Sequence, residues 1–85
     1  MPIISRFYGI TIRVNPREHL PPHFHVQYAD DNASVEIATG EVMVGKMSPR
    51  TWRFVREWLE LHRNEVQENW DCAQSGRACF DIEPL

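Results

Sequence analysis

The sequence predicts an α+β domain, an antiparallel sheet of four to five strands with one face covered by a long C-terminal helix or helix pair. Two observations support this prediction. Between residues 3 and 44, apolar and polar residues alternate in short runs, as in strands that bury one face. From residue 49 to residue 75, apolar residues recur every three or four positions, as on one side of a helix.

Length and composition indicate one domain spanning residues 1–85. The hydrophobic content of 42% excludes disordered and collagen-like classes, and no apolar run reaches the roughly 18 residues of a membrane-spanning helix. The N-terminus lacks the pattern of a signal peptide, so we expect a cytoplasmic protein without a membrane partner. Cys72 and Cys79 lack metal-site spacing and should be reduced thiols. The net charge of −3 does not indicate a nucleic-acid surface, although a local basic patch stays open.

Five β-rich runs account for the sheet, which we place between residues 3 and 44. Tyr8-Gly9 predicts a turn between the first two runs. If Asp31-Asn32 is a two-residue loop, Val26 faces Ile37 across the next hairpin. A turn at Thr39-Gly40 adds the last strand. The predicted strands are residues 3–7, 10–14, 23–28, 34–38 and 42–44.

Strand alternation assigns each side chain to one of two faces. The predicted inner face consists of Ile10, Ile12, Val14, Phe24, Val26, Tyr28, Val35, Ile37, Val42 and Val44. The predicted outer face consists of Thr11, Arg13, His23, His25, Gln27, Ser34, Glu36, Glu41 and Met43. The outer face should therefore carry a pair of neighbouring histidines.

The helical region, residues 49–75, begins at Ser48-Pro49, where Ser can cap the helix and Pro suits its first position. Its apolar stripe consists of Trp52, Val55, Leu59, His62, Val66, Trp70 and Ala73. It is either one helix or two with a joint near residues 62–64. The tail, residues 77–85, can add an edge strand over residues 79–82.

The segment from His19 to His25 carries three of the four histidines. Pro21-Pro22 should hold an extended approach to the strand. In the predicted register Glu36 is a diagonal neighbour of His25, about 7–8 Å away at the backbone. His23, His25 and Glu36 could thus hold Fe²⁺, Zn²⁺ or Mn²⁺, with His19 as a further ligand.

Other uses of these side chains stay open. The histidines could orient the loop through hydrogen bonds without a metal, or act as acid and base while Arg13 stabilises a phosphate. Arg50 and Arg53 could contact an anion or a partner, and Trp58, off the main stripe, could mark a partner surface.

His62 lies within the apolar stripe of the helical region. We expect it to be a core residue that is satisfied by a backbone carbonyl or by Tyr28.

Several segments together resemble a known family. They are Ile4 to Ile10, His19, Pro21 to His25, Tyr28, Thr39 to Val42, Gly45-Lys46, Trp58 to Arg63, Glu68 to Trp70 and Ile82 to Leu85. In combination they are similar to the small prokaryotic family filed as domain of unknown function 4160 (DUF4160). Two features depart from its pattern, namely the approach from Val14 to Arg17 and the apolar Leu20.

The resemblance implies a small domain without an assigned activity, of a kind encoded in compact two-gene units that are toxin–antitoxin-like. We therefore expect a cytoplasmic domain that acts through a protein partner or as a homo-oligomer. The alternative is a metal-dependent hydrolase, ribonuclease-like in its substrate, with a divalent metal at the His-rich site.

Overall fold

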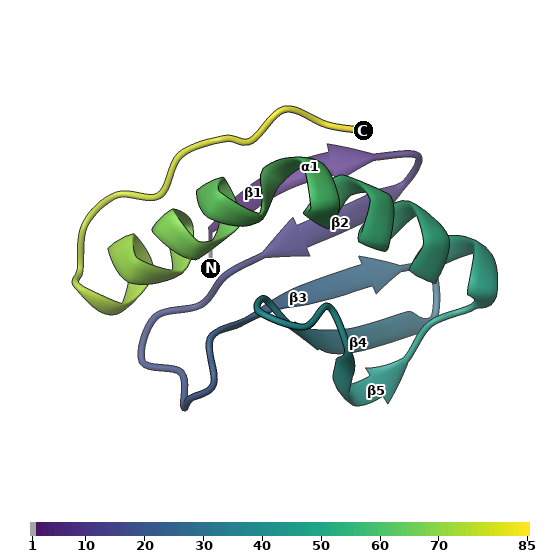
Figure 1. Cartoon of the computed structure of the whole chain (residues 1–85), viewed down its shortest axis with the longest axis horizontal. Coiled ribbons are helices and arrows are strands. Elements are labelled where there is room, and N and C mark those ends of the chain that lie inside the picture. The colour runs from purple at the N-terminus through teal and green to yellow at the C-terminus, as the bar shows by residue number, and fades with distance from the viewer. Residues whose placement is uncertain (1) are drawn as a thin grey trace.

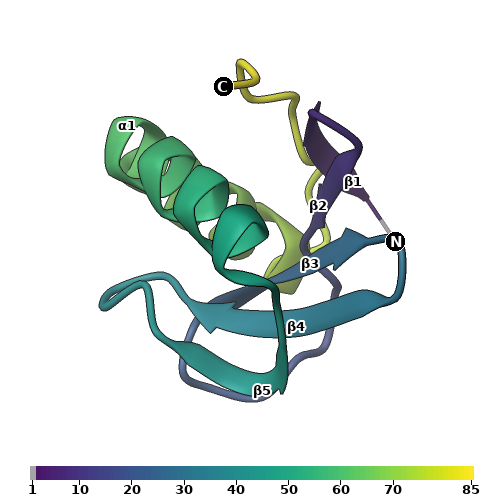
Figure 2. The same ribbon diagram turned by 90° about the vertical axis from the view of Figure 1, so that its right-hand side faces the viewer.

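The computed structural model describes residues 2–85 and contains a five-stranded antiparallel sheet in the order β1-β2-β3-β4-β5, followed by one helix. Figure 1 shows α1 lying across the sheet, and Figure 2 shows the sheet curving around one side of α1. This arrangement confirms the predicted fold class. The elements are β1 Ile3–Phe7, β2 Ile10–Arg13, β3 His23–Tyr28, β4 Asp31–Glu36, β5 Val42–Lys46 and α1 Pro49–Gln74.

The core lies between the sheet and α1. Its fully buried side chains include Phe24 from β3 and Trp58 from α1, whose ring centroids lie 5.8 Å apart. The Trp58 indole N–H donates to the carbonyl oxygen of Glu83 at 3.1 Å. The prediction that Trp58 marks a partner surface is therefore wrong, because the tail after α1 covers the side of the helix from which this ring extends.

The first hairpin turns at Tyr8-Gly9, as predicted. Both residues have positive φ, 51° and 81°, which is typical of the type I′ turn that matches the twist of a two-residue hairpin. The second hairpin differs from its prediction. Tyr28 pairs with Asp31 and Val26 with Ala33, so the loop is Ala29-Asp30.

The last hairpin is also longer than predicted. The Gly40 N–H donates to the Glu36 carbonyl and the Glu36 N–H to the Glu41 carbonyl, and the β4–β5 register shifts between Ser34 and Val35. Val42 and Val44 are consequently 40% and 64% exposed, which contradicts their assignment to the inner face.

α1 is one element with an internal break. The Ser48 hydroxyl accepts from the Thr51 N–H at 3.3 Å, which caps the helix as predicted. His62 has non-helical dihedral angles, φ −131° and ψ 19°, so the predicted joint is present inside a continuous helix. The Arg77 N–H donates to the Cys72 carbonyl at 2.9 Å, and Gly76 has a φ of 75°, as in a Schellman cap. The helix lacks the long apolar stretch that crossing a membrane requires.

The tail after α1 does not form the predicted edge strand. It returns along α1 to the outer edge of β1 (Figure 1), where the Ile82 N–H donates to the Ile4 carbonyl at 2.7 Å. The Asn69 side chain holds the tail from the other side, because it bonds both the N–H and the carbonyl of Phe80. One backbone hydrogen bond and the Asn69 side chain thus hold the tail in place of a β ladder.

Candidate metal centre

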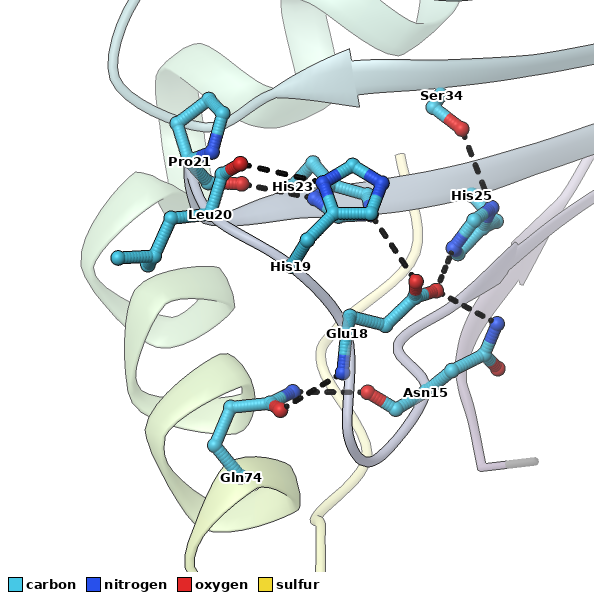
Figure 3. A network of polar contacts seen from close by, with 9 residues as sticks. All are labelled: Asn15, Glu18, His19, Leu20, Pro21, His23, His25, Ser34 and Gln74. Atoms are coloured by element: carbon cyan, nitrogen blue, oxygen red, sulfur yellow. Dashed lines mark hydrogen bonds and ion pairs between the residues drawn. The ribbon is translucent and has the colours of Figure 1, made fainter.

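The loop between β2 and β3 folds back over the start of β3 and is fixed there by the end of α1. The Gln74 side chain donates to the Asn15 carbonyl at 2.8 Å and accepts from the Glu18 N–H at 3.1 Å. The Asn15 amide in turn donates to Glu18 Oε1 at 3.1 Å. The Glu18 carboxylate is therefore aimed at the histidines of β3 (Figure 3).

Glu18, His23 and His25 form one cluster. Each offers a ligand atom, and the three atoms lie within 4.8 Å of one another. The carboxylate contacts His25 Nε2 through Oε1 and lies 3.6 Å from His23 Nε2 through Oε2. Among residues 2–85, this is the one group of three His, Cys, Asp or Glu side chains close enough to share a metal ion.

The hydrogen bonds of His23 fix its tautomer. Its Nδ1 lies 2.8 Å from the carbonyl oxygen of Pro21, and because a carbonyl oxygen only accepts, Nδ1 carries a proton. In the neutral ring Nε2 then presents a lone pair to Glu18 Oε2, which is also an acceptor. A cation between them, either a proton on Nε2 or a metal ion, makes this contact favourable.

His25 is held at both ring nitrogens. Its Nε2 donates to the Glu18 carboxylate in the metal-free protein, and its Nδ1 lies 3.3 Å from the Ser34 hydroxyl. A hydroxyl can donate or accept. The ring can therefore transfer its proton from Nε2 to Nδ1 and still keep both partners.

The cluster is enclosed on one side and open on the other. His23 is 2% exposed and packs on Trp70 of α1 with ring centroids 5.1 Å apart, while His25 is 31% exposed.

Burial of Glu18 opposes its ionisation. Hydrogen bonds from His25 and Asn15 and the charges of both histidines outweigh burial and lower the pKa of Glu18. The carboxylate is thus ready to bind a cation at neutral pH.

Residues 9–71 match the family model described as Domain of unknown function (DUF4160). The chain belongs to this family. No curated protein and no solved structure matched it. The matched part of this DUF4160 domain includes Glu18, His23 and His25, and it excludes β1 and the tail after α1.

The structure brings together two of the four residues predicted for the metal site. His23 and His25 lie side by side, with ring centroids 5.2 Å apart. Glu36 stands opposite His23 and, as predicted, diagonally from His25, but its carboxylate accepts from the Thr39 hydroxyl and is not part of the cluster. His19 stacks on His23 at 5.2 Å, but its ring is exposed and bonds to the Leu20 carbonyl.

Two further expectations about this DUF4160 site are wrong. His23 was expected on an open surface, yet the returning loop and Trp70 bury it. The approach through Leu20, Pro21 and Pro22 was expected to be extended, but the chain bends there with a cis Leu20-Pro21 peptide bond. The Pro21 carbonyl lies 2.8 Å from His23 Nδ1.

The predicted anion contacts do not form one patch. Arg13 donates to the Gln27 side chain at 2.8 Å on the outer face of the sheet. Arg50 lies over the Phe54 ring at 5.0 Å on α1, and Arg53 is exposed. Only Arg13 lies on the same face of the sheet as a residue of the cluster.

His62 also differs from its prediction. It is partly buried, and its Nδ1 lies 2.7 Å from Glu65 Oε1, so a carboxylate one turn ahead satisfies it instead of a backbone carbonyl or Tyr28.

Sequence reasoning missed Glu18. Two features of the sequence could have indicated it. Glu18 directly precedes the His-rich segment, and it follows a turn at Pro16-Arg17.

Proposed function

We propose that this DUF4160 domain binds a divalent metal ion through the Glu18 carboxylate and the imidazoles of His23 and His25, and acts as a metal-dependent hydrolase. The observation that supports this most directly is the convergence of three ligand atoms within 4.8 Å of one another. Two imidazoles and one carboxylate suit Zn²⁺, Fe²⁺ or Mn²⁺.

The cluster needs little movement to reach metal-binding geometry. Ligand atoms of a tetrahedral zinc site lie about 3.3 Å apart, given metal–ligand bonds of about 2.0 Å. Glu18 and His25 are already in contact, and Glu18 Oε2 lies 3.6 Å from His23 Nε2. Small side-chain rotations therefore suffice.

The residues around the cluster support the same proposal. Metal-binding histidines usually donate their second N–H to a carbonyl or carboxylate, which fixes ring and tautomer. His23 does so to the Pro21 carbonyl at 2.8 Å, and His25 has the Ser34 hydroxyl at its second nitrogen. Metal would take the place of the proton between His25 and Glu18.

The chemistry follows from the open side of the cluster. Three protein ligands leave a position for water, and a bound divalent metal lowers the pKa of that water toward neutrality. His25, at 31% exposure, marks the side from which solvent and substrate can enter.

Metal analysis tests this proposal. Protein made without a histidine tag, stripped with chelator and reloaded with Zn²⁺, Mn²⁺ or Fe²⁺, should hold about one ion per chain. His25→Ala should lose it. His62→Ala is the matched control, because His62 pairs with Glu65 outside the cluster, and should retain it. Wild-type protein that binds no ion stoichiometrically, or loses it equally in both variants, refutes the proposal.

We propose a protein partner as a second function, on a separate observation at β5. This strand forms the free edge of the sheet, whereas the edge of β1 receives a backbone hydrogen bond from the tail. Val42 and Val44 are exposed on this strand, and Val42 lines a groove of 330 Å³ together with Met47 and Trp52. An extended segment of a partner could add to this edge and place its side chains in the groove.

The second protein of a toxin–antitoxin-like gene pair is the candidate partner. Val44→Lys should abolish its co-purification from the native host, while Leu61→Lys should not, because Leu61 is equally exposed, at 66% against 64%, but lies on α1. Equal retention of the partner by both variants contradicts the β5 proposal. A wild-type dimer in light scattering that Val44→Lys dissociates would instead identify the occupant as a second copy.

A further inference from the structure

A row of side chains crosses the outer face of the sheet and includes His25. Directly opposed residues of antiparallel strands point to the same face and have Cα atoms about 4.5–5.5 Å apart. Arg13 of β2 pairs with His25, His25 with Ser34, and Ser34 with Val44. The Arg13 side chain is thus the immediate neighbour of His25 on this face.

A second row runs parallel to the first. By the same register it contains Arg6, Thr11, Gln27, Asn32 and Lys46, one from each strand. Across the two rows, the outer face carries the cationic side chains of Arg6, Arg13 and Lys46 and no carboxylate. These two rows therefore carry positive charge in a chain whose net charge is −3, and the carboxylates of the same face, Glu36 and Glu18, lie beside the two histidines.

Arg13 has unused hydrogen-bonding capacity. A guanidinium has five N–H donors, and the acceptor that Arg13 uses among residues 2–85 is the Gln27 side chain, at 2.8 Å. Within that part of the chain it forms no ion pair with a carboxylate. An arginine with free N–H donors and no carboxylate partner is well suited to binding an oxyanion through two parallel hydrogen bonds.

These side chains border a shallow pocket. Its volume is 160 Å³, below the roughly 300–1,000 Å³ of pockets that hold whole drug-sized ligands, so it suits one functional group of a larger molecule. Its polar lining consists of Arg13, His25, Gln27, Asn32 and Ser34.

We propose that this pocket binds a phosphoryl group of the substrate, with Arg13 as the main contact and the metal held by His25 at its edge. The inference rests on the proposed metal site and specifies its substrate class. A doubly charged phosphoryl group is favoured over a carboxylate because it offers three oxygens, two for the parallel donors of the Arg13 guanidinium and one for either the Ser34 hydroxyl or the metal. The nearest carboxylate of the cluster, Glu18, would be neutralised by that metal.

Phosphate titration followed by amide chemical shifts tests the inference, on zinc-loaded and on chelator-treated protein. Wild type should bind inorganic phosphate saturably and more tightly than acetate. Arg13→Gln should weaken phosphate binding by about tenfold or more, and Arg13→Lys by less. Arg53→Gln, an exposed arginine of α1, should bind as wild type. Zinc content should stay unchanged in all three variants.

The outcomes separate this inference from the metal proposal. Protein that holds zinc but binds phosphate no more tightly than acetate, or equally well in Arg13→Gln, overturns the phosphoryl pocket alone. Protein that takes up no zinc when it is loaded, yet binds phosphate through Arg13, overturns the metal site and supports the pocket. Adenosine monophosphate and a short single-stranded RNA with a 5′-phosphate, titrated in the same way, show whether the phosphoryl group comes from a nucleotide or from the end of a polymer.

Discussion

Replacing Glu18 by glutamine should remove most of the stabilisation that zinc gives the fold. The amide keeps the size of the side chain but loses the charge that binds the metal. Loss of residues that merely orient metal ligands costs about 10–100-fold in affinity, so loss of one of the three ligands should cost at least about 100-fold.

The expected magnitudes follow from mass action. Zinc at 100 times the wild-type Kd stabilises the folded state by about 2.7 kcal/mol. In a domain of 85 residues, each kcal/mol shifts Tm by about 4–8 °C, so wild type should gain about 11–22 °C. For Glu18→Gln the same zinc concentration only equals its Kd, and the gain should fall to about 0.4 kcal/mol, or about 2–3 °C.

Thermal unfolding followed by circular dichroism, with and without zinc, measures both shifts, and each variant serves as its own reference. Glu36→Gln is the matched control, because Glu36 stands opposite His23 in the β ladder but bonds to Thr39 outside the cluster. It should keep the wild-type shift. A full shift in Glu18→Gln, or a lost shift in Glu36→Gln, refutes the assignment of Glu18 as the metal-binding carboxylate.

Three further predictions concern stability. Gly45→Ala should lower the free energy of unfolding in urea by well over 2 kcal/mol, because its Cβ would lie 2.1 Å from the Asn32 carbonyl oxygen. Gly76→Ala is the control: Gly76 has a similar positive φ and nothing within 4 Å of the added Cβ, so the loss should be about 1–2 kcal/mol. The lowered pKa of Glu18 stabilises the fold above the unfolded value of 4.5, and this contribution is lost as pH falls through the lower folded pKa; metal-free Glu18→Gln should therefore lose less stability below pH 4.5 than wild type. Asn69→Ala should cost about 2–3 kcal/mol and expose the tail to protease, because it removes two hydrogen bonds to the Phe80 backbone from a fully buried side chain.

Local sequence signals were sufficient where neighbouring residues decide the structure. Tyr8-Gly9 specifies its turn through a glycine that accepts positive φ, and Ser48-Pro49 specifies the start of α1 through a cap and a preset dihedral angle. The buried stripe of α1 follows from helical periodicity. The fold class could therefore be predicted from the sequence.

Strand register could not be predicted with the same reliability. The polar run after Tyr28 contains several residues that favour turns. The chain turns at Ala29-Asp30, two residues before the predicted Asp31-Asn32 loop, and Ala29 has a φ of 50°. The partner of each β3 residue therefore shifts by four positions, and because this number is even, each side chain keeps its predicted face. The shift changes which residues are opposite one another, but Glu36 is a diagonal neighbour of His25 in both registers. Glu36 is outside the cluster because its carboxylate bonds to Thr39, which strand pairing alone does not predict.

The third ligand of the candidate site depends on contacts that no local pattern contains. Glu18 reaches His25 because Gln74, 56 positions later in the chain, holds the backbone of its loop. His25 is fixed by the sheet, and His23 is fixed by the sheet, Pro21 and Trp70. The cluster is therefore complete only when the end of α1 is docked against the β2–β3 loop, so a metal bound there would join the sheet, the loop and the helix and would stabilise the folded domain as a whole.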